Sequence, residues 1–201
     1  MSSKVLMCML IVSGLLSLPS AAAATERGEA IFAAGCFWCV ETNFEKVPGV
    51  TAVTSGYTGG KKDKPTYEEV SSGDTGHAES VRVLFDPAKV TYAHLLEVFW
   101  HNVDPVSANG QFCDRGNQYR SGIFYLDEAQ KKAAEASKLA VEKRLKLKVV
   151  TEITAAAAFF PAEDYHQDFY KKSPGRYYSY RAGCGRDNRL TELWGADANS
   201  H

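Results

Sequence analysis

The spacing of apolar and polar residues predicts an ordered mixture of strands and helices from residue 29 onward. Short apolar or alternating runs are typical of strands, and they cover 29–34, 50–57, 77–85, 121–126 and 149–155. Apolar residues at helical spacing predict helices over 36–46, 91–102, 127–147 and 162–170. Thr91 and Asp127 are suitable residues to cap two of these helices.

Two segments show neither period. Residues 104–120 are rich in Gly, Asn, Asp and Pro and predict a long loop, which in a compact domain is commonly functional. The stretch after Pro174 is expected to be irregular. The order β-α-β-β-α-β-α-β predicts an α/β fold of the α+β sandwich type: a mixed sheet with a split βαβ, ferredoxin-like core and an irregular C-terminal tail.

The N-terminal segment follows a different pattern. Lys4 precedes an apolar run over 5–18, which is followed by Pro19 and the small residues at 21–23. This order is typical of a secretory signal peptide, and the run is short for a bilayer span. We therefore expect a signal peptide over 1–23, cleaved near Ala23, and a single catalytic domain over 24–201. An uncleaved membrane anchor is the alternative. The expected location is periplasmic or secreted, with no stable membrane association after cleavage.

Composition places the chain among ordinary soluble globular proteins. It has 201 residues, of which 45% are hydrophobic and 23% charged. A formal net charge of -1 predicts no strong electrostatic attraction to nucleic acid or anionic lipid. We expect one domain and, as the default state, a monomer.

Cysteine usage points to redox chemistry. Cleavage would leave Cys36, Cys39, Cys113 and Cys184. An even count in a secreted protein is typical of structural disulfides, but a domain of this size does not need them to be stable. A C-x-x-C pair occurs in redox enzymes and in zinc sites. A structural zinc site would need a second such pair to complete its ligands. The sequence lacks one, so no metal is expected.

Cys36 stands at a predicted strand-to-helix turn, directly after Gly35. Backbone N–H groups at a helix start favour a thiolate, so a lowered pKa and a nucleophilic sulfur are expected for Cys36. Gly35 allows a sharp turn that leaves the sulfur open to a ligand. Phe37 and Trp38 cannot both face the core from one helix. At least one ring is therefore available as an apolar wall beside the sulfur.

Four motifs in order carry a resemblance to a known family. They are Gly35-Cys36-Phe37-Trp38 with Glu41, the glycine-rich tyrosine loop 55–60, the segment Gly76-His77-Ala78-Glu79, and Asp104-Pro105 with 116–121. Together they resemble the A-type peptide-methionine (S)-S-oxide reductases, over roughly residues 29 to 195. Four motifs in one order are far more specific than any one of them.

The resemblance implies a peptide-methionine (S)-S-oxide reductase, an oxidoreductase active in protein repair under oxidative stress. It would reduce methionine-S-sulfoxide, free or in proteins, to methionine without a cofactor. Cys36 would attack the sulfoxide and become a sulfenic acid. Glu79 would donate the proton, which at neutral pH needs a pKa raised by burial. A thioredoxin-like electron donor would restore the thiols.

Further roles follow from the same resemblance. The hydroxyls of Tyr57 and Tyr119 would hold the sulfoxide oxygen. Phe37 and Trp38 would form the pocket for the S-methyl group. Asp104 would anchor polar groups or the backbone amide of the substrate.

A second thiol must resolve the sulfenic acid and form a redox-active disulfide. Cys184 is the first choice, because it lies in a glycine-flanked, mobile tail and family members often carry a recycling cysteine in this region. We therefore expect a Cys36–Cys184 disulfide during turnover. Cys39 is the second choice, since C-x-x-C geometry permits a disulfide. Cys113 is the third.

Two other classes of protein remain open from the residues alone. One is a dithiol oxidoreductase acting on protein disulfides through Cys36 and Cys39, although the motif lacks the usual Gly-Pro interior. The other is a secreted binding module whose four cysteines form two structural disulfides.

Overall fold

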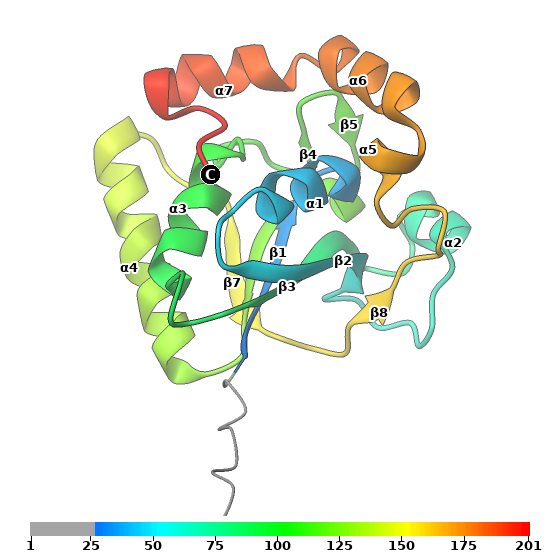
Figure 1. Ribbon diagram of the computed structural model, residues 1–201, viewed down its shortest axis with the longest axis horizontal. Helices are drawn as coiled ribbons and strands as arrows, with labels where there is room; N and C mark the ends of the chain where they lie inside the picture. Colours follow the sequence, from blue (N-terminus) through cyan, green and yellow to red (C-terminus); the bar gives the residue numbers. More distant parts are fainter. Residues whose placement is uncertain (1–26) are drawn as a thin grey trace, which may run out of the picture.

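The computed structural model describes residues 27–201, which fold around a six-stranded sheet (Figure 1). The predicted signal peptide, residues 1–23, lies outside the described residues. In spatial order the strands are β7 (Glu152–Ala155), β6 (Ser121–Tyr125), β1 (Gly28–Ala34), β3 (Ala78–Phe85), β2 (Val50–Thr58) and β8 (Phe160–Pro161).

The four inner strands have the predicted ferredoxin-like topology. Their order is β6-β1-β3-β2, and all neighbouring pairs are antiparallel. Helix α1 (Phe37–Glu45) connects β1 to β2, while β3 lies between these two strands. This is a split βαβ unit. Strand β7 pairs in parallel with β6, which makes the sheet mixed, so the predicted fold class is confirmed.

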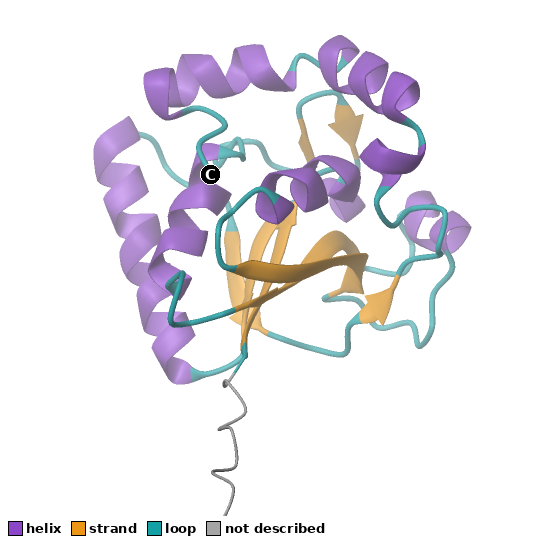
Figure 2. Cartoon of the chain, viewed as in Figure 1, coloured by secondary structure: helices purple, strands orange, loops and turns teal. Residues whose placement is uncertain are grey.

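Helices pack on one face of the sheet and enclose the main core. Helices α3 (Tyr92–His101) and α4 (Glu128–Leu145) lie side by side along one flank of the sheet (Figure 2). The Phe32 ring of β1 stacks on Phe44 of α1 and Phe99 of α3, with ring centroids 4.9 and 5.3 Å apart. Among residues 27–201, no helix has both the length and the apolar character required to cross a bilayer.

The prediction of an irregular C-terminal tail is wrong. The C-terminal segment forms α5 (Phe169–Lys172), α6 (Pro174–Gly183) and α7 (Arg186–Trp194). Pro174 takes the first position of α6, where a missing N–H leaves no hydrogen bond unmade. The glycines around 183–185 hide the helical pattern in the sequence. In Figure 1, α6 and α7 lie across the end of the sheet where α1 begins.

The helix predicted over 162–170 is also wrong for most of its length. Residues 162–163 are irregular, turns occupy 164–168, and helical structure begins at Phe169. The Gln167 side chain pairs with both backbone groups of Ser55, donating to the carbonyl and accepting from the N–H at 2.9 Å each. These bonds hold the segment along β2 instead of letting it coil into a helix.

Three short elements lie outside the predicted strands and helices. They are α2 (Tyr67–Ser72), the β4–β5 hairpin (Gly110–Gln111 with Asp114–Arg115) and the single turn η1 (Asn117–Tyr119). The hairpin and η1 lie in the predicted loop 104–120, and α2 lies in a stretch with no prediction.

Arg186 fastens the C-terminal helices to the sheet. Its side chain is only 2% exposed. One terminal nitrogen donates to the Ala34 carbonyl and the other to the Asn102 carbonyl, at 2.9 Å each. The guanidinium also lies over the Phe112 ring, 4.2 Å from its centroid. Arg186 therefore joins the start of α7 to the end of β1.

We expect Arg186→Met to lower the free energy of unfolding by about 3 kcal/mol, because two buried carbonyls lose their donor. Urea denaturation measures this loss. Arg115→Met is the matched control: Arg115 is exposed, so its replacement should change stability by less than about 0.5 kcal/mol. Equal stability of the two variants would contradict the anchoring role of Arg186.

Candidate active site

The turn between β1 and α1 presents Cys36. Gly35 has a φ of +80°, and a Cβ at this position would lie 2.6 Å from the Cβ of Gln111. The position therefore requires glycine. The chain turns here, and Cys36 becomes the residue that precedes the first turn of α1. Its side chain is largely buried, and it faces a cavity.

That cavity has a volume of about 230 Å³ and brings together residues from six elements. Its walls come from the start of α1 and from α2, β3, β5, η1 and α6. The lining residues are Cys36, Phe37, Trp38, Tyr67, Glu79, Asp114, Tyr119 and Tyr180. The structure thus gathers the predicted residues Cys36, Phe37, Trp38, Glu79 and Tyr119 around one space.

Glu79 is the buried acid of this cavity. Only 2% of the residue is exposed, and one carboxylate oxygen accepts the Phe37 backbone N–H at 3.0 Å. Burial raises the pKa of Glu79 to about 8, although the bond from Phe37 opposes the shift. The carboxyl group is therefore largely protonated at neutral pH. A carboxyl group that keeps its proton at neutral pH is what the sequence analysis expects of the proton donor.

The two thiols at the start of α1 do not show the predicted low pKa at Cys36. Burial raises the pKa of Cys36, and its hydrogen bond to Cys39 raises it further. That same bond lowers the pKa of Cys39 to about 6, assisted by the charge of Arg186. The first helical N–H, from Phe37, is donated to Glu79 and not to sulfur. These surroundings therefore favour the thiol form of Cys36 and the thiolate form of Cys39.

An aromatic assembly forms the apolar side of the cavity. The Trp38 ring stacks on Phe169 at 3.7 Å, and its indole N–H donates to Nδ1 of His166 at 3.0 Å. Burial lowers the pKa of His166 to about 4, so the ring is neutral and Nδ1 can accept. The Phe37 ring lies 4.9 Å from the same histidine. Both aromatic residues after Cys36 are therefore held in place.

Tyr57 is not in the cavity, which corrects one predicted role. The residue is fully buried, and its hydroxyl donates to Glu163 at 2.8 Å. Tyr67, at the start of α2, lines the cavity instead. Burial and the nearby Glu79 raise the pKa of Tyr67, and burial also raises that of Tyr119. Both hydroxyls therefore stay protonated and can donate.

Asp104 likewise lies outside the cavity. Its carboxylate accepts from Arg189 at 2.8 Å and from the Val106 N–H at 3.1 Å, so it serves the loop and α7. Asp114 of β5 is the aspartate that lines the cavity. The Tyr180 hydroxyl donates to this carboxylate at 2.5 Å. Neither Asp114 nor Tyr180 is in the set predicted from sequence.

The cysteines pair differently from the sequence prediction. Cys113 and Cys184 form a disulfide, while Cys36 and Cys39 are free and buried. Cys184 is not in a mobile tail, because it caps the C-terminus of α6. Its sulfur is already bonded, so the structure does not support Cys184 as the first partner of Cys36.

Two groups of possible metal ligands occur within residues 27–201. In one, Lys171 bridges Glu45 and Asp168 beside Glu41, at 2.8 and 2.7 Å. In the other, Asp114 adjoins the two sulfurs of the disulfide. The Lys171 ammonium is paired with carboxylates of the first group, and the two sulfurs of the second group are bonded to each other. Neither is an open metal site.

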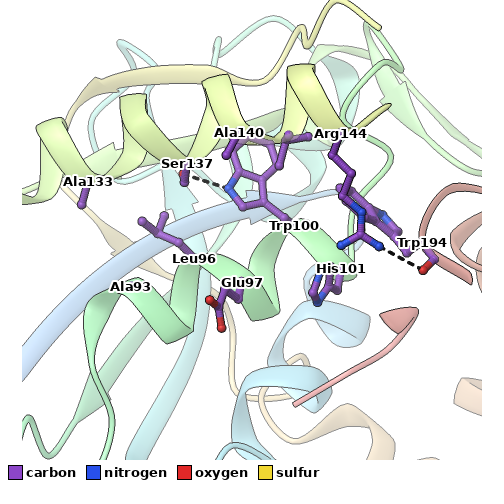
Figure 3. Close-up of a pocket in the computed structure, with 11 residues that line it drawn as sticks. Ala93, Leu96, Glu97, Trp100, His101, Ala133, Ser137, Ala140, Arg144 and Trp194 are labelled. Carbon is purple, nitrogen blue, oxygen red and sulfur yellow. Dashed lines mark hydrogen bonds between the residues drawn. The ribbon is translucent and has the colours of Figure 1, made fainter. Parts of the chain in front are cut away.

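A second cavity, of about 410 Å³, lies between α3 and α4 near Trp194 (Figure 3). The Trp100 indole donates to Ser137 across it at 2.9 Å, and Arg144 donates to the Trp194 carbonyl at 3.4 Å. None of the predicted site residues lines this cavity, and none of its lining residues is a cysteine. The chemistry therefore belongs to the smaller cavity at Cys36.

A family model described as peptide methionine sulfoxide reductase matches residues 28–198. The chain belongs to the peptide methionine sulfoxide reductase family. It is 51% identical to peptide methionine sulfoxide reductase MsrA 2 of Rhizobium meliloti over 185 residues, covering 92% of this chain and 91% of that protein. It is 52% identical to MsrA of Bacillus subtilis over 169 residues, 83% of this chain and 96% of that one.

Solved structures of this reductase family share the fold. Reduced Mxr1 from Saccharomyces cerevisiae superposes with a TM-score of 0.72 at 30% identity, over 81% of this chain and 94% of that one. Methionine sulfoxide reductase A of Corynebacterium diphtheriae gives 0.69 at 30% identity, over 76% and 77%. This protein therefore has the fold of these solved structures, and its cavity at Cys36 lies within that fold.

Proposed function

We propose that this protein reduces methionine-S-sulfoxide, free or in proteins, to methionine and so repairs oxidised proteins. The observation that carries the proposal is the cavity at Cys36. It joins a cysteine sulfur to a buried acid that stays protonated at neutral pH, with two tyrosine hydroxyls and an apolar wall around them. These are the groups that sulfoxide reduction requires, because a sulfoxide oxygen must be protonated or strongly hydrogen-bonded before sulfur is attacked.

Each wall of the cavity has a part in the reaction. The S-methyl group of the substrate packs against Phe37 and Trp38. The sulfoxide oxygen accepts hydrogen bonds from Tyr67 and Tyr119 and a proton from Glu79. Cys36 passes its own proton to Cys39 and attacks the substrate sulfur. Methionine leaves, and the oxygen stays on Cys36 as a sulfenic acid.

We further propose that Cys39 resolves this intermediate. Its thiol attacks the Cys36 sulfur, water leaves, and a Cys36–Cys39 disulfide forms. Two observations support this assignment: Cys36 and Cys39 are both free and buried at the start of α1, and Cys184 is bonded to Cys113. A thioredoxin-like dithiol then reduces the disulfide and restores the resting pair.

Export to the periplasm or the medium is part of the proposal. The apolar run over 5–18 and the small residues at 21–23 support it. N-terminal sequencing of the mature protein tests this assignment, since an intact Met1 would contradict cleavage near Ala23.

Separated S and R epimers of methionine sulfoxide test the reaction. We expect dithiothreitol-dependent release of methionine from the S epimer alone, and no release with Cys36→Ser, because the attacking sulfur is lost. Chromatography of methionine measures both. Turnover of neither epimer by the wild-type protein would overturn the proposed function.

The pH dependence of kcat/KM reports the acid and the thiolate. Activity should rise as pH increases through about 6, where Cys39 ionises, and fall as pH increases through about 8, where Glu79 loses its proton. Glu79→Gln should reduce kcat/KM by about 100-fold and remove the alkaline fall. Glu97→Gln, which changes an exposed carboxylate on α3, should leave the profile intact. An alkaline fall that persists in Glu79→Gln would exclude Glu79 as the acid.

Peptide mapping after one equivalent of substrate, without reductant, identifies the resolving thiol. We expect a Cys36–Cys39 link in the wild-type protein. Cys39→Ser should form the sulfenic acid more slowly, because Cys36 loses its proton acceptor. The reaction should then stop at the sulfenic acid, which dimedone traps, because no thiol remains beside it. Cys184→Ser should still form the Cys36–Cys39 link. A Cys36–Cys184 link in the wild-type protein would show that the Cys113–Cys184 bond opens during turnover.

A further inference from the structure

We propose that Glu163 is a positioning residue for sulfoxide reduction: its carboxylate fixes the backbone at the start of α2 so that Tyr67 presents its hydroxyl to the sulfoxide oxygen. The inference rests on the proposed function and deepens it. It gives a role in the reaction to the segment 162–168, between β8 and α5, although none of these seven residues lines the cavity at Cys36.

Glu163 binds two tyrosines, one with each oxygen of its carboxylate. Oε1 accepts the backbone N–H of Tyr67 at 2.8 Å, and Oε2 accepts the hydroxyl of Tyr57 at 2.8 Å. The first tyrosine begins α2 and the second lies in β2. In Figure 1 the segment 162–168 passes α2 on its way from β8 to α5. One side chain on this segment therefore joins α2 to the sheet.

The N–H of Tyr67 has no acceptor within its own helix. It is the first N–H of α2, and the first N–H groups of a helix find no helical carbonyl. The capping pair does not use it either, because the Thr66 hydroxyl accepts the Glu69 N–H and the Glu69 carboxylate accepts the Thr66 N–H. Glu163 supplies the missing acceptor. Since the bonded nitrogen is attached to the Cα of Tyr67, this bond places the root of the tyrosine side chain.

The segment that carries Glu163 also holds the ring of Tyr67. The His166 ring lies 4.3 Å from the Tyr67 ring, measured between centroids. The His166 N–H donates to the carbonyl of Glu163 at 2.8 Å, so these two residues belong to one turn. Both the backbone and the ring of Tyr67 are thus set by this turn. The side chain then reaches the cavity, which it lines.

The charge states agree with an accepting carboxylate and a donating tyrosine. Burial raises the pKa of Glu163, but its own N–H, the N–H of Tyr67 and the Tyr57 hydroxyl lower it, and the net shift is downward. Glu163 is therefore ionised at neutral pH, and an ionised carboxylate is a stronger acceptor than a neutral group. Burial raises the pKa of Tyr67, so its hydroxyl keeps the proton that it donates.

The rate of the first turnover tests this role. With excess methionine-S-sulfoxide and no reductant, methionine is released in a burst whose amplitude counts active sites and whose rate reports the chemical step. We expect Glu163→Gln to slow the burst about tenfold at saturating substrate, because the amide keeps one acceptor oxygen and turns an N–H group toward the other donor. The substrate concentration at half-maximal rate should change less than about twofold, since this hydrogen bond acts mainly in the transition state.

A double variant shows whether Glu163 acts through the Tyr67 hydroxyl. Tyr67→Phe should also slow the burst about tenfold. Adding Glu163→Gln to Tyr67→Phe should slow it no further, because the hydroxyl that Glu163 positions is already absent. Glu68→Gln is the matched control, since Glu68 is an exposed carboxylate on α2. Its burst rate should equal that of the wild-type protein.

The pH profile of the burst separates positioning from a general loosening of the cavity. In Glu163→Gln the fall in rate as pH increases through about 8 should stay where Glu79 places it in the wild-type protein. A loosened cavity would instead admit water to Glu79. The pKa of that acid would then drop toward its ordinary value, and the fall would move to lower pH.

The outcomes separate this inference from the proposed function. An unchanged burst rate in Glu163→Gln, a double variant slower than Tyr67→Phe, or an alkaline fall at lower pH would overturn the role of Glu163 while leaving the reductase intact. Absence of methionine release by the wild-type protein would overturn the proposed function itself.

Discussion

A buried guanidinium must find its hydrogen-bond acceptors inside the protein, and Arg186 finds them at the end of β1 and at the end of α3. The Ala34 carbonyl directly precedes the turn that presents Cys36, and the Asn102 carbonyl follows α3. Satisfying this one charge places α7, and with it α6, over the start of α1. The same charge lies close enough to Cys39 to favour its thiolate. The Arg186 guanidinium therefore affects both the position of the thiol pair and its reactivity.

Local signals in the sequence are sufficient for much of the fold and for the centre of the site. The apolar runs, capping residues and the Gly35 turn depend on near neighbours, so the ferredoxin-like core and the position of Cys36 are predictable. Glu79 is found through the family resemblance of its motif, and the structure buries it on β3. The helices after residue 168 are not predictable in this way, because their stability comes from packing against distant segments.

The two misassigned side chains show where local reasoning stops. Tyr57 and Tyr67 lie in neighbouring stretches, and either could supply a hydroxyl. The choice depends on Glu163, which takes the Tyr57 hydroxyl from 106 residues away. Asp104 and Asp114 differ in the same manner, because the Asp104 carboxylate accepts a hydrogen bond from Arg189. The pKa of Cys36 is a third case, because the N–H expected to stabilise its thiolate is taken by Glu79 from another strand. Residue spacing alone cannot predict which distant side chain takes each of these hydrogen-bonding groups.

The contribution of α6 to the cavity has a consequence for the order in which the enzyme becomes active. The sheet and the helices over it are complete by residue 161, but the wall formed by Tyr180 comes from a later part of the chain. Contacts between segments so far apart in sequence form late, because a long loop must close first. A nascent chain can therefore hold its catalytic cysteine in a folded sheet and still lack a finished binding site. The cavity is finished only once α6 has packed against it.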